Sequence, residues 1–239
     1  MTPSVRIDVR HPRLRLLLLT AFLFFSAGGN AQQPVAIPVP GSGAISADVY
    51  GTGDRGVVLA HGGRFDRSSW TKQARALSDA GFHVVAIDFR ASVESRAGRP
   101  SACLYDDACL AVDVLAAVRY LRSSGAKTVS VVGASLGGGA AARASIEARA
   151  GEIDRVVLIA HMPVEQPQRM KGRKLFIVAR GDIGSGNVPR LPAIRAQFDK
   201  AAEPKELIVL EGTAHAQLLF DSPAGERLLR EILKFLSTP

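Results

Sequence analysis

The sequence is poor in the residues that would mark several common classes of protein. Of its 239 residues only two are cysteine and one is tryptophan. Two cysteines cannot build a disulfide-rich scaffold, and no histidine or second cysteine pair lies beside them at the spacing of a zinc site. The basic residues are scattered, without runs of five and with little aromatic interleaving, which argues against nucleic acid as a partner.

Long apolar runs are also missing, and this bears on the N-terminus. The run from Leu16 to Phe25 is well short of the ~20 residues that span a bilayer. It follows four arginines and precedes the small residues Gly29 to Ala31, an order typical of a signal peptide. We predict a signal peptide over residues 1–31 and a mature domain over residues 32–239. The mature chain would be exported, periplasmic or secreted, with no stable membrane insertion, and a retained anchor is the alternative.

What is present is the composition of an ordinary globular domain. Hydrophobic residues make up 47% of the chain and charged residues 22%, and the length allows one sizeable core. The first 31 residues hold four Arg and one Asp, so the net charge of +8 falls to +5 in the remainder. We interpret this mild positive charge as a solvated surface.

The two cysteines, Cys103 and Cys109, lie six residues apart. Export would place them where a thiol pair can oxidise. We therefore predict a small local disulfide, with two free buried thiols as the alternative.

Apolar strand patterns alternate with helical patterns along the chain. Such alternation predicts an α/β fold, in which a mostly parallel sheet is covered by helices on both faces. A segment rich in Pro and Gly, residues 34–56, predicts one or two antiparallel strands at an edge. Only about a dozen residues separate the strands near Ala160 and Lys174, so we expect no sizeable lid there and an open pocket. The expected strands are 57–60, 83–89, 128–133, 155–160, 174–179 and 206–210, and the expected helices 69–80, 105–123, 136–150, 192–202 and 224–236.

The stretch Gly133-Ala134-Ser135-Leu136-Gly137 follows a predicted strand and opens a predicted helix. A G-x-S-x-G match alone is weak, but this context places Ser135 on a sharp turn where a nucleophile would be exposed. The amide of Leu136, at the helix N-terminus, would face a developing oxyanion. A phosphate-binding loop is the rival interpretation, and the Gly-Lys-Ser/Thr that it requires is missing.

A serine nucleophile needs a base held by a carboxylate. Asp182 and His215 each follow a later predicted strand, so a parallel sheet would bring both to the edge that carries Ser135. The alternative for Asp182 is an aspartate that forms a turn or caps a helix. The alternative for His215 is a loop histidine that makes one structural hydrogen bond. Glu165 is the reserve candidate for the acid.

These residues, together with "VVLAHGGRF" at 57–65, resemble the α/β-hydrolase family over nearly all of the mature chain. Within the family, the chain resembles the lidless esterases and dienelactone hydrolases. The resemblance implies that the His-Gly segment supplies a second oxyanion donor, which falls on the amide of Gly63. Arg64 is the competitor, because the chain reads His-Gly-Gly-Arg where many lipases read His-Gly-Gly-Gly.

Other residues receive structural interpretations. His61 is expected to order the oxyanion loop, and His161 either lines the pocket with Met162 or is structural. "IDFRASVESRAG" resembles a glycine-rich loop of the family, but it has Ala91 and Val93 where glycines are usual, so no functional role is predicted for Arg90.

The sequence thus predicts an exported serine hydrolase that cleaves carboxylic esters of small or medium size. Ser135, His215 and Asp182 would be catalytic, and Gly63 and Leu136 would hold the oxyanion. No cofactor and no metal is expected, and the partner is a small-molecule ester. A peptidase or a dienelactone or carbon-carbon hydrolase could use the same residues, and a non-catalytic binding protein on the same scaffold is the alternative from another class. The oligomeric state is not predicted.

Overall fold

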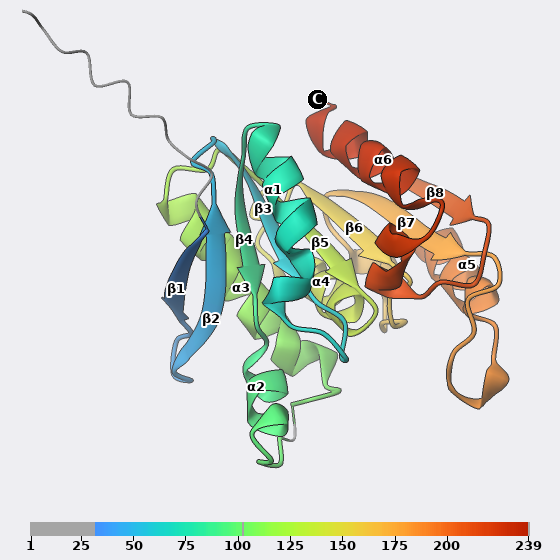
Figure 1. Cartoon of the computed structure of the whole chain (residues 1–239), viewed down its shortest axis with the longest axis horizontal. Coiled ribbons are helices and arrows are strands. Elements are labelled where there is room, and N and C mark those ends of the chain that lie inside the picture. The colour runs from blue at the N-terminus through green and yellow to red at the C-terminus, as the bar shows by residue number, and fades with distance from the viewer. Residues whose placement is uncertain (1–31, 102, 239) are drawn as a thin grey trace, which may run out of the picture.

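One eight-stranded sheet with helices on both of its faces forms the domain in the computed structural model (Figure 1). The structure describes residues 32–101 and 103–238, so the predicted signal peptide lies outside the described residues. The strands are β1 (Gln33–Pro38), β2 (Ala44–Tyr50), β3 (Arg55–Ala60), β4 (Phe82–Ile87), β5 (Thr128–Ala134), β6 (Arg155–Ile159), β7 (Arg173–Ala179) and β8 (Lys205–Leu210). The α-helices are α1 (Thr71–Asp79), α2 (Arg90–Arg96), α3 (Asp107–Ser123), α4 (Leu136–Glu147), α5 (Arg190–Lys200) and α6 (Gly225–Ser237).

The strand order is β1-β2-β4-β3-β5-β6-β7-β8. From β4 to β8 every neighbouring pair is parallel, whereas β1 and β2 form an antiparallel hairpin that pairs with β4 at the edge. The predicted mixed sheet is therefore confirmed. Because β5, β7 and β8 are parallel, the loops that follow them meet at one edge of the sheet.

Each face of the sheet has its own hydrophobic core. In β3, Val58 contributes to the core beneath α3, α4 and α5, while its neighbour Val57 contributes to the core beneath α1 and α6. Successive strand side chains point to opposite faces, so a strand buried on both sides has to be apolar throughout. This explains the uninterrupted Val, Ile and Leu runs of the sequence.

Helix α2 is the one α-helix in the described chain that the sequence pattern did not predict. It occupies the segment that resembles a glycine-rich loop of the family, and Ala91 and Val93, which replace the usual glycines, both lie within it. Alanine is a far better helix former than glycine, and this favours the helix. Arg90 at its first position binds Asp113 on α3, with Nε 2.7 Å from Oδ1. Arg90 is thus engaged in packing two helices together.

Helix α3 begins at Asp107, two residues later than predicted, because Asp106 caps it. The Asp106 carboxylate accepts hydrogen bonds from the amides of Ala108 and Cys109, at 3.0 and 3.3 Å. Cys109 in the first helical turn is disulfide-bonded to Cys103, with 5.4 Å between their Cα atoms. The predicted disulfide is confirmed. Across the described residues, no helix has the length and hydropathy to span a bilayer.

Candidate active site

Ser135 lies in a strained turn between β5 and α4. Its backbone has φ 50° and ψ −112°, a region that costs a residue with a side chain on the order of 1–3 kcal/mol. The glycines on either side make this turn possible: a Cβ atom on Gly133 would collide with the carbonyl of Gly137, and one on Gly137 with the carbonyl of Ala60. The G-x-S-x-G spacing is therefore required by the close approach of α4 to the sheet.

Three backbone hydrogen bonds fix this turn. The Ser135 amide donates to the carbonyl of Ile159 at 2.8 Å, and the Ser135 carbonyl accepts from Gly139 at 3.0 Å and from Met162 at 3.1 Å. The hydroxyl is thus carried by a backbone tied to both β6 and α4. A strained backbone conformation persists only where surrounding contacts hold it in place, and these three hydrogen bonds do so at Ser135.

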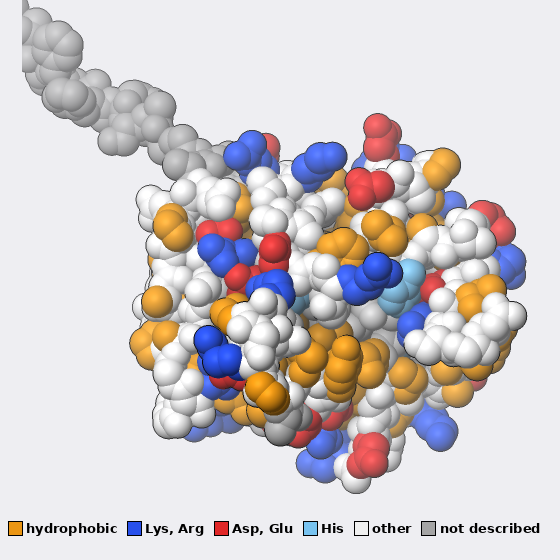
Figure 2. Space-filling view, turned by 60° about the horizontal axis from the view of Figure 1, so that its bottom comes forward, with side chains coloured by type: hydrophobic (Ala, Val, Ile, Leu, Met, Phe, Trp, Pro, Cys, Tyr) orange, Lys and Arg blue, Asp and Glu red, His pale blue; other side chains and the backbone are white. Residues whose placement is uncertain are grey.

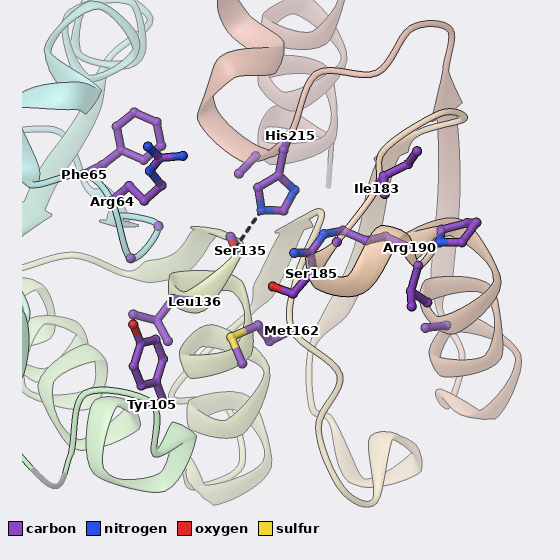
Figure 3. Close-up of a pocket in the computed structure, with 17 residues that line it drawn as sticks. Arg64, Phe65, Tyr105, Ser135, Leu136, Met162, Ile183, Ser185, Arg190 and His215 are labelled. Atoms are coloured by element: carbon purple, nitrogen blue, oxygen red, sulfur yellow. Dashed lines mark hydrogen bonds between the residues drawn. The ribbon is translucent and has the colours of Figure 1, made fainter.

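The side chains of Ser135, His215 and Asp182 form a continuous hydrogen-bonded chain. Figure 3 shows its outer bond, between His215 and Ser135. His215 Nε2 lies 2.9 Å from Ser135 Oγ, and His215 Nδ1 lies 2.8 Å from Asp182 Oδ2. Asp182 follows β7 and is fully buried, whereas the His215 side chain, which follows β8, is 30% exposed. The structure therefore brings together the three residues that the sequence singled out, in the order hydroxyl, imidazole, carboxylate.

The second oxygen of Asp182 faces Arg190, a residue that the sequence analysis missed. Asp182 Oδ1 has no hydrogen-bond partner in the described part of the chain, and Arg190 Nε lies 3.6 Å from it. The Arg190 amide also donates to the Asp182 carbonyl at 2.9 Å. The loop after β7 folds back through a β-bridge between Ile183 and Pro189, and this bridge returns Arg190 to Asp182. No local pattern marks such a pair, because the contact depends on the path of the loop.

The loop after β3, which contains Gly63, is held by a second residue that was missed, Gln217. Its Oε1 accepts from the amide of Gly62 at 2.8 Å, and its Nε2 donates to Ser69 Oγ at 2.6 Å. The Gly62 amide is therefore occupied, and Gly63 and Arg64 are the candidate donors of this loop.

The Leu136 amide, at the first position of α4, has no acceptor within its own helix. Both predicted oxyanion donors thus lie beside Ser135 on the same cavity.

His61 orders the same loop, as expected. Its ring is fully buried, and Nε2 accepts from the Phe89 amide at 3.3 Å, so the ring proton lies on Nδ1, 2.8 Å from the carbonyl of Gly62. Burial lowers the pKa of His61 and favours this neutral form. His61 is therefore a structural residue.

His161 and Glu165 lie away from the hydrogen-bonded chain. Met162 lines the cavity beside Ser135, but His161 packs edge-on against Phe176 and is only 1% exposed. Burial lowers the pKa of His161 to about 4. Glu165 lines the neighbouring cavity, and the carboxylate at hydrogen-bond distance from His215 is that of Asp182, so the reserve assignment of the acid to Glu165 is wrong.

A cavity of about 760 Å³ opens beside Ser135 and His215. Among its described lining residues the fully charged side chains are two arginines, Arg64 and Arg190, which lie on either side of Ser135 (Figure 3). Figure 2 shows one face of the molecule, on which a histidine side chain reaches the surface beside a Lys or Arg side chain. Apolar side chains gather below them in this view. Within the described residues, no cluster of three or more His, Cys, Asp or Glu could hold a metal ion.

Comparison with known proteins gives the family. The sequence matches the profile of the alpha/beta hydrolase family over residues 57–231. The chain belongs to this family. A search of curated proteins returned no match to this hydrolase.

Solved structures resemble this alpha/beta hydrolase over most of its length. A dienelactone hydrolase from Anabaena variabilis is 23% identical, with 86% of this chain and 94% of that one aligned at a TM-score of 0.68. An esterase from Pyrococcus furiosus is 18% identical, covering 86% and 92%, with a TM-score of 0.68. An esterase from Exiguobacterium antarcticum is 13% identical, covering 86% and 100%, with a TM-score of 0.66. These likenesses establish the shared fold.

Proposed function

We propose that the protein is a serine hydrolase that cleaves carboxylic esters of small or medium size through an acyl-enzyme on Ser135. The observation that carries this proposal is the hydrogen-bonded chain from the Ser135 hydroxyl through His215 to the buried carboxylate of Asp182. A serine hydroxyl is weakly nucleophilic until a base removes its proton, and the imidazole nitrogen that faces Ser135 lies at hydrogen-bond distance.

The first half of the reaction forms the acyl-enzyme. His215 Nε2 takes the proton of Ser135 Oγ as the oxygen attacks the ester carbonyl carbon. The negative charge on the carbonyl oxygen is held by the amides of Gly63 and Leu136, and each such donor contributes on the order of 10²–10³ in rate. The intermediate collapses when His215 returns the proton to the leaving alcohol. Asp182 stays ionised throughout and keeps the ring proton on Nδ1.

The second half releases the acid. A water molecule takes the place of the alcohol, gives a proton to His215 Nε2 and attacks the acyl carbon. The bond to Ser135 Oγ then breaks as His215 returns the proton to the serine. Water is the only co-reactant that the cycle consumes, and every proton that moves passes through the imidazole of His215.

Hydrolysis of p-nitrophenyl esters of graded chain length tests this proposal. The wild type should release p-nitrophenol from the acetate, and Ser135→Ala should lose several orders of magnitude in kcat. Wild-type protein without ester turnover would contradict it. Peptide nitroanilides and a dienelactone should be run beside the esters, because cleavage of one of these in preference would favour a peptidase or a dienelactone hydrolase on the same residues. Tight binding without turnover of any compound would favour a binding protein.

We further propose that the chain is exported after removal of residues 1–31. The support is the order of arginines, apolar run and small residues at the N-terminus, together with a disulfide, which is typical of oxidising compartments. N-terminal sequencing of the protein from its native host tests this. A first residue of Gln32 is expected, and a chain that still begins at Met1 would contradict it.

A further inference from the structure

Exposed apolar side chains gather at the mouth of the cavity. Six large hydrophobic side chains are exposed in the described part of the chain, and Tyr105, Ile183 and Val188 of these line the cavity beside Ser135. Single exposed hydrophobic residues need no explanation, but a group of them beside a cavity marks a surface that binds apolar groups. Tyr105 and Ile183 lie on opposite sides of Ser135 (Figure 3).

Tyr105 is 74% exposed and yet borders two cavities. The second cavity, of about 320 Å³, shares Tyr105, Leu136 and Met162 with the first. The two cavities are therefore neighbouring parts of one cleft, and the tyrosine ring stands where they meet. The far part of the second cavity carries the charged side chains of Asp107, Arg143 and Glu165, so an apolar group would stay against the Tyr105 ring on the side of the first cavity.

The backbone around Tyr105 is held unusually firmly for an exposed turn. The amide of Asp106 donates to the carbonyl of Cys103 at 3.2 Å, and the Asp106 carboxylate caps α3. The disulfide between Cys103 and Cys109 then closes a covalent ring around the turn that contains Tyr105. Because the backbone of this turn is already ordered before binding, a ligand that packs on Tyr105 has only the side-chain rotation to immobilise, and its contacts are more effective.

We propose that Tyr105, held over the cleft by the Cys103–Cys109 disulfide, is the residue that selects esters carrying an apolar alkyl chain or aryl group. This inference rests on the proposed ester hydrolysis at Ser135 and adds the substrate class. The tyrosine ring offers a large apolar face with only two rotatable bonds, so it binds an alkyl or aryl group at low entropic cost. The disulfide acts through Tyr105 and does not contact the reacting atoms.

The test compares p-nitrophenyl octanoate with p-nitrophenyl acetate in four proteins. These are wild type, Tyr105→Ala, the double variant Cys103→Ala with Cys109→Ala, and the triple variant. Tyr105→Ala should raise KM for the octanoate about tenfold, the effect of losing roughly 55 Å² of apolar contact. KM for the acetate, which lacks the long alkyl chain, should stay within about twofold. Loss of the disulfide should raise the octanoate KM in the wild-type background and have no further effect in the Tyr105→Ala background.

Two controls separate this role from a general loss of stability. Tyr105→Phe keeps the ring and should retain the wild-type octanoate KM, since the apolar face is what binds. Wild type treated with a mild reductant should reproduce the KM of the double cysteine variant while kcat for the acetate is retained.

An unchanged ratio of octanoate to acetate KM in Tyr105→Ala would overturn the inference and leave the ester hydrolase proposal standing. The inference also fails if disulfide loss raises the octanoate KM equally with and without the tyrosine. Wild type that hydrolyses neither ester would overturn the proposed function and this inference with it.

Discussion

Replacement of Gln217 by methionine tests how the candidate oxyanion loop is held. The Gln217 side chain is 5% exposed and joins the Gly62 amide to Ser69 Oγ, through hydrogen bonds of 2.8 and 2.6 Å. Methionine has a similar volume and removes both bonds without opening a cavity. The Gly62 amide is then buried without an acceptor, which costs about 2 kcal/mol, within the usual range of roughly 1–3. For a chain of this length that corresponds to a fall in Tm of about 4–8 °C.

Activity should fall as well, because Gly62 precedes the proposed donor Gly63. Complete loss of one oxyanion donor costs on the order of 10²–10³ in kcat, so a displaced loop should cost about tenfold or more. Thermal unfolding and p-nitrophenyl acetate kinetics measure the two effects.

The matched control is Ser69→Ala, which removes the outer hydrogen bond from Gln217 and the bond from Ser69 Oγ to the Asp66 carbonyl, and leaves the bond between Gln217 and Gly62. Its kcat should stay within about twofold of wild type, with a loss of about 1 kcal/mol in stability. If Gln217→Met and Ser69→Ala proved equal in both Tm and kcat, the bond to Gly62 would have no special role, and the reasoning would be refuted.

Three further substitutions have definite expected outcomes. Asp182→Asn should lower kcat by about 10⁴-fold with little change in KM, because the amide no longer keeps the ring proton of His215 on Nδ1; a kcat near wild type would contradict this. Arg190→Met should lower the free energy of unfolding by about 2 kcal/mol, since it leaves the buried Asp182 Oδ1 without its counter-charge, and Arg190→Lys should recover part of the loss in a urea titration. His161→Leu should flatten the dependence of stability on pH. The buried ring of His161 has a pKa of about 4, below the unfolded value of about 6.5, so the unfolded chain takes up the extra proton as pH falls. Wild type should therefore lose about 3 kcal/mol more than His161→Leu between pH 6.5 and 4 in urea unfolding, and parallel curves would exclude His161 as the cause.

The sheet and the hydrogen-bonded chain follow from patterns that are local in the sequence. The strands β3 to β7 are largely apolar runs because both of their faces are buried. Chain order alone brings the residues after β5, β7 and β8 to one edge. Ser135, Asp182 and His215 could therefore be singled out without coordinates. The glycines beside Ser135 added weight, because helix and sheet approach too closely there for any Cβ atom.

Residues that support the site through distant contacts were beyond the reach of the sequence. Gln217 and Gly62 are 155 positions apart, and nothing in the composition near either one predicts their hydrogen bond. Arg190 meets Asp182 because the intervening loop turns back on itself, and loop paths are not encoded by periodicity. The departure at α2 has a different cause: a family loop pattern was followed although Ala91 and Val93 replace its glycines, and glycine is the poorest helix former of these three residue types.

In the proposed reaction Ser135 becomes acylated, and labelling with a fluorophosphonate probe followed by mass spectrometry measures the reactivity of this serine. The probe should add one phosphonyl group to the wild-type protein, on the peptide that contains Ser135. Ser135→Ala, which keeps the fold and the cavity, should remain unlabelled, and His215→Ala should be labelled far more slowly. Wild-type protein that resists the probe, or that carries the label on another residue, would contradict the account.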